Sequence, residues 1–190
     1  MSVYLITGVQ GVGKSTVCCV LHNTLPAARI HDYADFMLEA TKISDKDLLS
    51  SIPASGRQSI YEHANDLLRR MLGVTPDVIL EAHLSVEIGE DSFLSFSPKD
   101  HAEVQVAGIV VVEANPRSVW GRRSTDTARR RRHSSPASIN AQQQINRVLA
   151  RFISEELAIP MLRVNNTRAD KCASRITQWL GRVGLSKAGK

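Results

Sequence analysis

Short apolar runs alternate along the chain with longer segments whose apolar residues recur at the helical period. The clearest of the short runs are continuously apolar, which is typical of parallel strands that are buried on both faces of a sheet. The runs predict strands at 3–6, 28–31, 77–80, 106–112 and 160–164. The periodic segments predict helices at 14–25, 35–41, 55–72, 116–121, 137–157 and 169–180. This alternation predicts an α/β fold, a five-stranded parallel sheet with helices on both faces.

The pattern extends over a single domain, residues 1–182, which is followed by a tail at 183–190. Segment 84–105 fits the pattern least well, because it is polar and acidic and contains Pro98. It is expected to be an insert, either a hairpin or a mobile loop over a site. In the helix at 137–157 the apolar residues are expected on one side: Ile139, Ile145, Val148, Leu149 and Phe152.

The composition is that of a globular protein, with 43% hydrophobic and 23% charged residues. No stretch approaches the roughly 20 apolar residues of a membrane helix, and the first residues lack the pattern of a signal peptide. The cysteines Cys18, Cys19 and Cys172 make a poor disulfide framework and fit a reducing compartment. We therefore expect a cytoplasmic protein without a membrane partner.

Charge is concentrated in one place. Seven arginines and one aspartate give residues 117–132 a net charge of +6, against +5 for the whole chain, so the remainder sums to −1. The protein is therefore close to neutral apart from one arginine block. The question that this block raises is which anion it binds.

Residues 8–15, Gly-Val-Gln-Gly-Val-Gly-Lys-Ser, match the phosphate-loop pattern G-x-x-x-x-G-K-[ST] between a predicted strand and a predicted helix. Glycines let the backbone curl so that successive N–H groups face an anion, and the helix N-terminus adds positive partial charge. Lys14 can reach the β- and γ-phosphates of a nucleotide, and the Ser15 hydroxyl can ligate Mg²⁺. The expected nucleotide-binding residues here are Gly8, Gly11, Val12, Gly13, Lys14, Ser15 and the neighbouring Thr16.

Glu81 ends the third predicted strand. A carboxylate at the carboxyl end of a buried strand beside a phosphate loop is placed to hold Mg²⁺, often through water. Ser15 and Glu81 are therefore the predicted metal site, and the alternative for Glu81 is a carboxylate that faces solvent. Two roles are open for His83. It could contact the substrate, or it could be a histidine at a strand end whose hydrogen bonds are satisfied within the protein.

The arginine block is predicted to form a lid over phosphates at about residues 122–134. Arginine forks stabilise the negative charge of a transferring phosphoryl group, and a closing lid excludes water. The sequence Thr125-Asp126-Thr127 within the block indicates a folded turn. A nucleic-acid patch and a plain solvated surface are the alternatives that stay open.

Several of these motifs together resemble those of the archaeal-type adenylate kinases. They are the phosphate loop, residues 32–37 (Asp-Tyr-Ala-Asp-Phe-Met), residues 81–83 (Glu-Ala-His), and Arg122 followed by residues 126–131 (Asp-Thr-Ala-Arg-Arg-Arg). The resemblance covers roughly residues 3–165. The segment at 33–37 and the lid that begins at Arg122 are far more specific than the phosphate loop. The resemblance implies a P-loop kinase fold, ATP as donor, Mg²⁺ as cofactor and a nucleoside monophosphate as acceptor. It also implies a possible homo-oligomer, since members are often homotrimeric.

The resemblance further implies roles for single residues. Arg122, Arg129 and Arg131 would be the catalytic arginines of the lid, around the transferring phosphoryl group. Residues 33–37 would line the acceptor pocket. Asn165 and the turn after it would lie near the adenine of ATP.

This chain departs from the family at two points. The family usually has aspartate where this chain has Glu81. It also has a basic residue shortly after the Asp-x-His motif, whereas residues 84–91 of this chain are acidic and would host a nucleotide phosphate poorly. Two alternatives stay open for Arg57. It could supply the missing positive charge, or it could be a surface residue of its helix.

The leading interpretation is a kinase of nucleoside monophosphates, which needs no general base because the acceptor phosphate is already a nucleophile. The alternative is a kinase of a hydroxyl-bearing small molecule, with Asp35 accepting the hydroxyl proton. Asp35 could instead cap the helix that follows it. A third interpretation is a nucleotide-dependent RNA-binding or assembly factor, although 5% aromatic residues leave few stacking platforms.

Overall fold

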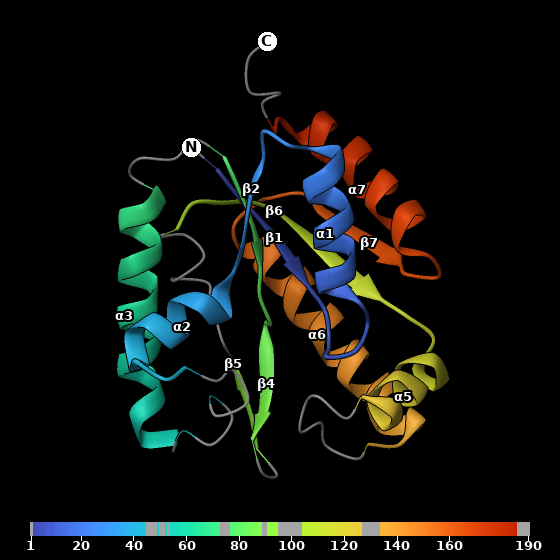
Figure 1. Ribbon diagram of the computed structural model, residues 1–190, viewed down its shortest axis with the longest axis horizontal. Helices are drawn as coiled ribbons and strands as arrows, with labels where there is room; N and C mark the ends of the chain where they lie inside the picture. Colours follow the sequence, from blue (N-terminus) through green and yellow to red (C-terminus); the bar gives the residue numbers. More distant parts are fainter. Residues whose placement is uncertain are drawn as a thin grey trace.

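The computed structural model describes residues 2–44, 49, 52, 54–72, 77–88, 91–94, 104–126 and 134–185. A five-stranded sheet lies at its centre, and every pair of neighbouring strands is parallel (Figure 1). The predicted sheet is therefore confirmed, with the first strand in the middle. In spatial order its strands are β2 (Arg29–Asp32), β3 (Val78–Glu81), β1 (Val3–Thr7), β6 (Val106–Glu113) and β7 (Met161–Asn165).

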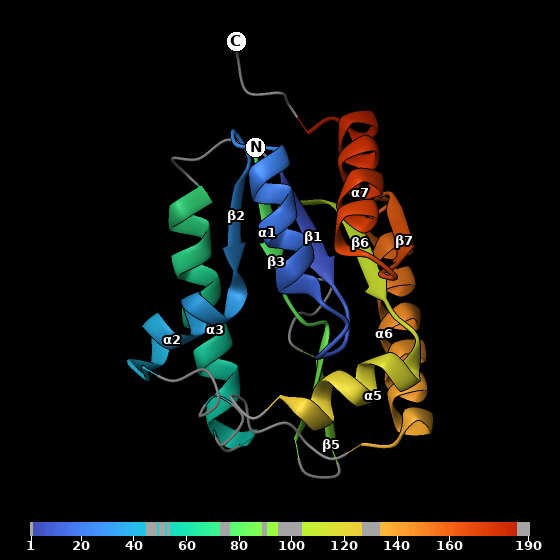
Figure 2. The same cartoon turned by 45° about the vertical axis from the view of Figure 1, so that its right-hand side comes forward.

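Helices cover both faces of this sheet, and each face has its own hydrophobic core. One core joins the sheet to α1 and α7, which also pack against each other. The other core joins the sheet to α2, α3 and α6 (Figures 1 and 2). The helices are α1 (Lys14–Thr24), α2 (Tyr33–Thr41), α3 (Ala54–Leu72), α5 (Pro116–Thr125), α6 (Pro136–Glu156) and α7 (Ala169–Val183).

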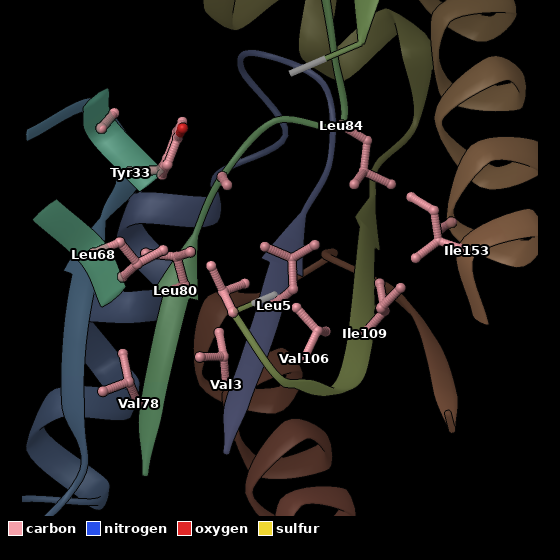
Figure 3. Close-up of a cluster of buried hydrophobic side chains, with 14 of the residues drawn as sticks. Val3, Leu5, Tyr33, Leu68, Val78, Leu80, Leu84, Val106, Ile109 and Ile153 are labelled. Atoms are coloured by element: carbon pink, nitrogen blue, oxygen red, sulfur yellow. The ribbon is translucent and has the colours of Figure 1, made fainter. Parts of the chain in front are cut away.

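Strand β1 shows why the strands are continuously apolar. Val3 and Leu5 belong to the core under α3 and α6, whereas Tyr4 and Ile6 belong to the core under α1 and α7. Figure 3 shows Leu5 between side chains of the two neighbouring strands. Because successive side chains of a strand point to opposite faces, a strand between two helical layers needs apolar residues at every position.

Three helices begin at residues that cap their first turn. The side chains of Asn115 and Ser135 cap α5 and α6, and a proline follows each of them. Asp32 caps α2, where its carboxylate accepts a hydrogen bond of 3.0 Å from the Ala34 N–H. The helix therefore begins at Tyr33, two residues earlier than expected, and Asp35 lies in its first turn instead of at the cap.

The buried face of α6 carries both apolar and polar residues, and it leaves part of the expected apolar side exposed to solvent. Ile145, Val148 and Phe152 are 46%, 66% and 50% exposed. The buried positions include Gln143 and Asn146, which are 5% and 3% exposed. The expected apolar side is therefore confirmed for Ile139 and Leu149, which pack in the core, and wrong for the other three residues, because polar contacts described below occupy part of the buried face.

Segment 84–105 contains a hairpin, one of its two predicted alternatives. Strands β4 (Ser85–Ile88) and β5 (Asp91–Leu94) pair in antiparallel fashion and lie apart from the central sheet. Glu87 and Asp91 belong to these strands, whereas the other acidic residues of the segment lie outside the described residues, and the effect of this charge on an acceptor stays a prediction. In the described part of the chain, no helix has the length and apolar character required to cross a membrane.

Candidate functional site

The phosphate loop lies between β1 and α1, as predicted, and its glycines are required by the surrounding atoms. A Cβ on Gly8 would lie 2.3 Å from the carbonyl oxygen of Val112. Gly11 and Gly13 have φ of 81° and 91°, in the left-handed region that favours glycine. Gly13 is also the N-cap of α1 and makes no side-chain cap hydrogen bond, so the first N–H groups of this helix remain available to an anion.

Lys14 is buried within this loop. Its Nζ donates to the carbonyl oxygen of Gly8 at 2.9 Å and to that of Val9 at 3.4 Å. Burial lowers the pKa of Lys14 to about 8, and the negative charge of Glu81 opposes this shift. The lysine is therefore a cation that the protein holds with few water contacts, which strengthens its attraction for a phosphate.

The two predicted metal ligands lie in contact. Glu81 ends β3 and pairs in register with Ile6 of β1, so its side chain emerges beside the phosphate loop. The Ser15 hydroxyl donates to its carboxylate Oε1 at 2.9 Å. A hydroxyl and a carboxylate are oxygen ligands of the kind that Mg²⁺ prefers, so this pair fits the predicted metal.

His83 lies against the same loop. Its Nδ1 is 3.1 Å from the Gly8 carbonyl oxygen. Burial, followed by the charge of Lys14, holds the pKa of His83 well below its usual value, so the ring is neutral. Because a carbonyl oxygen only accepts, Nδ1 carries the proton in this contact. His83 and Lys14 thus fix the same carbonyl from two directions, and a contact of His83 with substrate stays a prediction.

Two arginines of α5 reach the loop from the other side. Arg122 Nη1 lies 3.3 Å from the carbonyl oxygens of both Gly11 and Val12. Arg123 donates to the Gln10 carbonyl through Nε at 3.0 Å and Nη2 at 2.8 Å. Arg122 thus lies beside the loop, and its role at a transferring phosphoryl group stays a prediction, whereas sequence analysis gave no separate role to Arg123. The other predicted lid arginines, Arg129 and Arg131, lie outside the described residues.

The turn after β7 also contacts the phosphate loop, through a residue that sequence analysis missed. Asn166 Nδ2 donates to the Val12 carbonyl at 2.8 Å, and its backbone N–H donates to Glu113 at 2.7 Å. The side chain of Asn166 is buried, whereas the predicted Asn165 is exposed. The turn after β7 therefore contacts the phosphate loop through Asn166, and its expected place near the adenine stays a prediction.

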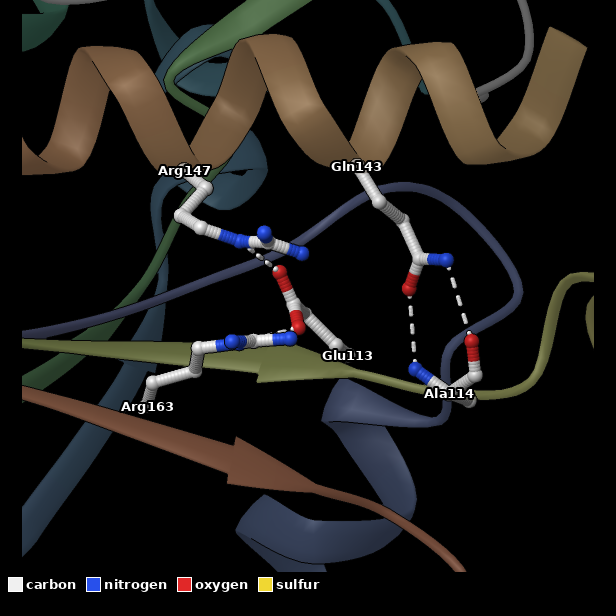
Figure 4. A network of polar contacts seen from close by, with 5 residues as sticks. All are labelled: Glu113, Ala114, Gln143, Arg147 and Arg163. Carbon is white, nitrogen blue, oxygen red and sulfur yellow. Dashed lines mark hydrogen bonds and ion pairs between the residues drawn. The ribbon is translucent and has the colours of Figure 1, made fainter.

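A buried polar face of α6 supports this edge of the sheet (Figure 4). Gln143 forms two hydrogen bonds with Ala114, accepting from its N–H at 2.9 Å and donating to its carbonyl at 3.0 Å. The Thr7 hydroxyl donates to Asn146 at 3.3 Å. Arg147 of α6 and Arg163 of β7 both pair with the Glu113 carboxylate. These contacts link the ends of β1 and β6 to one helix, directly below the phosphate loop.

The predicted acceptor side lies at α2 and α3, and its residues differ in burial. The Tyr33 ring belongs to the core, and its hydroxyl donates to Asn65 at 2.8 Å. Asp35 is exposed on α2. Arg57 is only 4% exposed and donates to the Ile52 carbonyl at 2.6 Å, so it is not the surface residue that one alternative expected. Tyr33 therefore supports the wall between α2 and α3 and does not offer its hydroxyl to a substrate.

Several sequence relatives of this chain are adenylate kinases, and a family model also matches it. A family model described as an AAA domain matches residues 7–140. An adenylate kinase from Thermococcus sibiricus is 30% identical over 151 residues, which cover 76% of this chain and 76% of that protein. An adenylate kinase from Pyrobaculum aerophilum is 28% identical over 151 residues, which cover 77% of this chain and 75% of that protein.

Solved structures share the fold at low sequence identity. Shikimate kinase from Acinetobacter baumannii, in complex with shikimate, matches with a TM-score of 0.65 and 14% identity, over 98% of this chain and 96% of that chain. Shikimate kinase from Bacteroides thetaiotaomicron matches with a TM-score of 0.61 and 13% identity, over 95% and 98% of the two chains. These likenesses concern the fold alone.

Proposed function

We propose, from the premise that this chain belongs to the AAA-domain family and to the archaeal-type adenylate kinases, that it transfers the γ-phosphoryl group of ATP to a nucleoside monophosphate. That the chain is an ATP-dependent kinase is already shown by its family. The acceptor and the roles of single residues are the proposal. The observation that carries it is the 2.9 Å contact between Ser15 and Glu81 at a complete phosphate loop that holds a buried lysine.

The residues of the loop would perform the donor half of the reaction. Lys14 and the N–H groups at the start of α1 would bind the β- and γ-phosphates of ATP. Ser15 and Glu81 would hold Mg²⁺, which when bound neutralises phosphate charge. Arg122 already lies over the loop at Gly11 and Val12, and we assign it, with Arg129 and Arg131, to the charge that spreads over the transferring phosphoryl group.

The acceptor half needs a nucleophile but no base. An oxygen of the acceptor phosphate would form the new bond to the γ-phosphorus, while the bond from that phosphorus to the leaving ADP oxygen breaks. The acceptor oxygen is already an anion, so no proton has to be removed from it. The protein therefore contributes positioning and positive charge, which is what the arrangement around Lys14 supplies.

A panel of acceptors tests this proposal. The protein is incubated with γ-labelled ATP, Mg²⁺ and, in separate reactions, AMP, other nucleoside monophosphates, hydroxyl compounds and RNA. Label transfer to a monophosphate is the expected result, and Lys14→Ala should abolish it. Transfer only to a hydroxyl compound would favour the alternative in which Asp35 acts as base. Hydrolysis that RNA stimulates, without transfer to any small acceptor, would favour an RNA-binding factor.

A homo-oligomer, which the family resemblance implies, is also part of the proposal. The exposed apolar residues of α6, Ile145, Val148 and Phe152, form a stripe along one side of that helix. Apolar surface of this kind is typical of contacts between copies. Val148→Lys should lower the mass of the particle measured by light scattering. An oligomer with unchanged mass in this variant would place the contact elsewhere.

A further inference from the structure

Arg122 and Arg123 are neighbours on α5, yet their contacts with the phosphate loop differ. Arg122 is exposed, and a single nitrogen of its guanidinium lies at 3.3 Å from two carbonyl oxygens. Arg123 is half-buried and directs two nitrogens at the single carbonyl oxygen of Gln10, at 3.0 and 2.8 Å. The geometry of Arg122 suits a side chain that can turn to a phosphate. The geometry of Arg123 suits a fixed contact within the protein.

The guanidinium of Arg123 also reaches two other segments. Its Nη1 donates to the Ser134 hydroxyl at 2.7 Å, and its Nη2 donates to Gln142 Oε1 at 3.2 Å. Ser134 directly precedes the residue that caps α6, and Gln142 lies within that helix. One planar group thus joins α5, the phosphate loop and the first part of α6, which lie close together in Figures 1 and 2. A lysine cannot reproduce these contacts, since it lacks the fixed fork of donors.

The contact with Gln10 has a consequence for the next residue. In a trans peptide group the carbonyl oxygen and the following N–H point in opposite directions, and the described chain has no cis peptide bonds. Because Arg123 fixes the Gln10 carbonyl toward α5, the Gly11 N–H must point away from α5. Arg123 therefore sets the orientation of one of the backbone donors that a phosphate loop presents to its ligand.

We propose that Arg123 is a positioning residue, which orients the Gln10–Gly11 peptide group of the phosphate loop and ties it to Ser134 and α6. It acts on ATP through this peptide group and does not bind the phosphates itself. Its positive charge is nevertheless close to the site, since it contributes to the lowered pKa of Lys14. The inference rests on the proposed use of the phosphate loop for ATP, but not on which acceptor is used.

Three variants on α5 test this role. Arg123→Lys keeps the charge and removes the fork, Arg123→Ala removes both, and Arg117→Ala is the matched control on an exposed position of the same helix. ATP affinity is measured by calorimetry, and kcat and KM for ATP are measured with the best acceptor. We expect both Arg123 variants to weaken ATP binding about tenfold and to lower kcat/KM at least as much, because small misplacements at a reacting site are costly. The control should stay within about twofold.

The ATP affinity and kcat/KM of Arg123→Lys separate a positioning role of Arg123 from direct binding of phosphate. Lysine binds phosphate as a point charge, so it would retain much of the effect of an arginine that serves the phosphates through its charge alone. If Arg123→Lys keeps the wild-type ATP affinity and kcat/KM while Arg123→Ala loses both, the positioning role is wrong. A kcat that falls while ATP affinity is unchanged would also overturn it, because a displaced loop amide weakens the bound state as well.

Hydrogen exchange of the protein alone gives a readout that does not depend on catalysis. In Arg123→Lys the amides of residues 10–13 should exchange faster, by about tenfold at the most affected position, while those of β1 and α7 do not change. Faster exchange throughout the chain would mean that Arg123 only stabilises the fold, and would contradict the proposal. If the wild-type protein transfers label to no acceptor, the proposed function fails, whereas calorimetry and exchange still decide the role of Arg123.

The contact with Ser134 can be tested in the same way. Ser134→Ala removes one partner of the guanidinium and should raise exchange in the loop by a smaller factor than Arg123→Lys. The double variant should show no further increase, since the serine acts through the arginine. Independent, additive effects of the two changes would show that Ser134 does not belong to this connection.

Discussion

Two glutamates end the strands on either side of β1, and their surroundings are opposite in kind. Glu81 ends β3 and receives a hydrogen bond from the neutral hydroxyl of Ser15. Glu113 ends β6, and each of its carboxylate oxygens pairs with a guanidinium, Oε1 with Arg147 and Oε2 with Arg163. One carboxylate thus faces a group that can share a metal ion with it, whereas the other is neutralised within the protein.

The difference lies in the elements that cross the two strand ends. Helix α1 brings Ser15 to β3, at the end of the phosphate loop, whereas α6 and β7 bring arginines to β6. A carboxylate at the carboxyl end of a parallel strand therefore has no fixed role. The element packed above it decides whether it serves the reaction or holds the fold together, and the two roles should separate under mutation.

The largest expected effect is on the reaction and comes from Glu81→Gln. This change keeps the shape of the side chain and removes its charge, so Mg²⁺-dependent transfer should fall about a hundredfold. The free energy of unfolding should change by less than about 1 kcal/mol, because the partner of Glu81 is neutral. Initial rates over a Mg²⁺ titration measure the first quantity and urea denaturation the second. Glu81→Asp keeps the charge and should recover most of the rate.

Glu113→Gln is the matched control for this change, at the other strand end. Transfer in Glu113→Gln should stay within about threefold of the wild type, since Glu113 is neutralised by protein groups. An equal loss of transfer in both variants would show that the comparison between the two carboxylates is wrong.

The sequence predicted the Glu81 side of this comparison because the information is local. A continuous apolar run followed by the phosphate-loop pattern fixes a strand, a turn and a helix within a few residues. Parallel strands end at the same edge of a sheet, so the acidic end of β3 had to lie near Ser15. The five strands, the order of the elements and the contact between Ser15 and Glu81 all follow from such short-range patterns.

The Glu113 side could not be predicted, because no short motif marks the residues that contact it. Gln143 and Asn146 are polar and look like surface residues of an amphipathic helix, whereas Ile145 and Phe152 look like core. The structure reverses this assignment, since hydrogen bonds to the ends of β6 and β1 allow the polar residues to be buried. The contact of Asn166 with the Val12 carbonyl is likewise marked by no motif, and the expected place of Asn165 near the adenine stays a prediction.

The next effect is on stability and comes from Gln143→Leu. Leucine is apolar and similar in size, but it leaves the N–H and the carbonyl of Ala114 buried without the partners that Gln143 supplies. The free energy of unfolding should fall by about 2 kcal/mol. Urea denaturation measures the change, and Gln144→Leu is the matched control, since the neighbouring Gln144 is exposed. Equal losses in the two variants would show that the contacts with Ala114 contribute nothing.

The pH dependence of stability in Gln143→Glu tests whether Gln143 donates a hydrogen bond to the Ala114 carbonyl. A carboxylate can accept from the Ala114 N–H but cannot donate to the carbonyl, whereas the protonated acid can do both. Its protonated form is therefore favoured in the folded state, which raises the pKa of this glutamic acid above its unfolded value. The variant should gain stability relative to the wild type as the pH falls toward about 5 and lose it as the pH rises. A pH-independent difference would contradict the donor role of Gln143.

A smaller effect concerns the pH dependence of ATP binding. Burial lowers the pKa of Lys14 to about 8, so the lysine loses its charge as the pH rises through that value. ATP affinity, measured by calorimetry without Mg²⁺, should be constant below about pH 7.5 and fall by at most about tenfold per pH unit above 8. Because Glu81 raises this pKa, the fall should begin at lower pH in Glu81→Gln. In Glu113→Gln the fall in ATP affinity should begin at the same pH as in the wild type.

The same shift has the opposite sign for the stability of the protein without ATP. The unfolded lysine has a pKa near 10.5, so between pH 8 and 10.5 the unfolded chain binds the proton and the folded chain does not. The contribution of Lys14 to the free energy of unfolding therefore rises with pH in that window. Lys14→Met should remove this rise. A rise of the same size in the variant would assign it to another group.

The smallest effect is the cost of removing the Glu113 charge. Arg147 and Arg163 are 37% and 54% exposed, so water screens both of them once the carboxylate is gone. Glu113→Gln should therefore lower the free energy of unfolding by only about 1 kcal/mol, less than the loss of a fully buried ion pair. Glu155→Gln is the control: Glu155 pairs with Arg151 on the open surface of α6, and its removal should change nothing measurable in urea. If Glu113→Gln costs no more than this control, the ion pairs at the end of β6 add nothing to stability, and the apolar packing of α6, the contacts of Gln143 and the pairing of β7 with β6 hold this edge together.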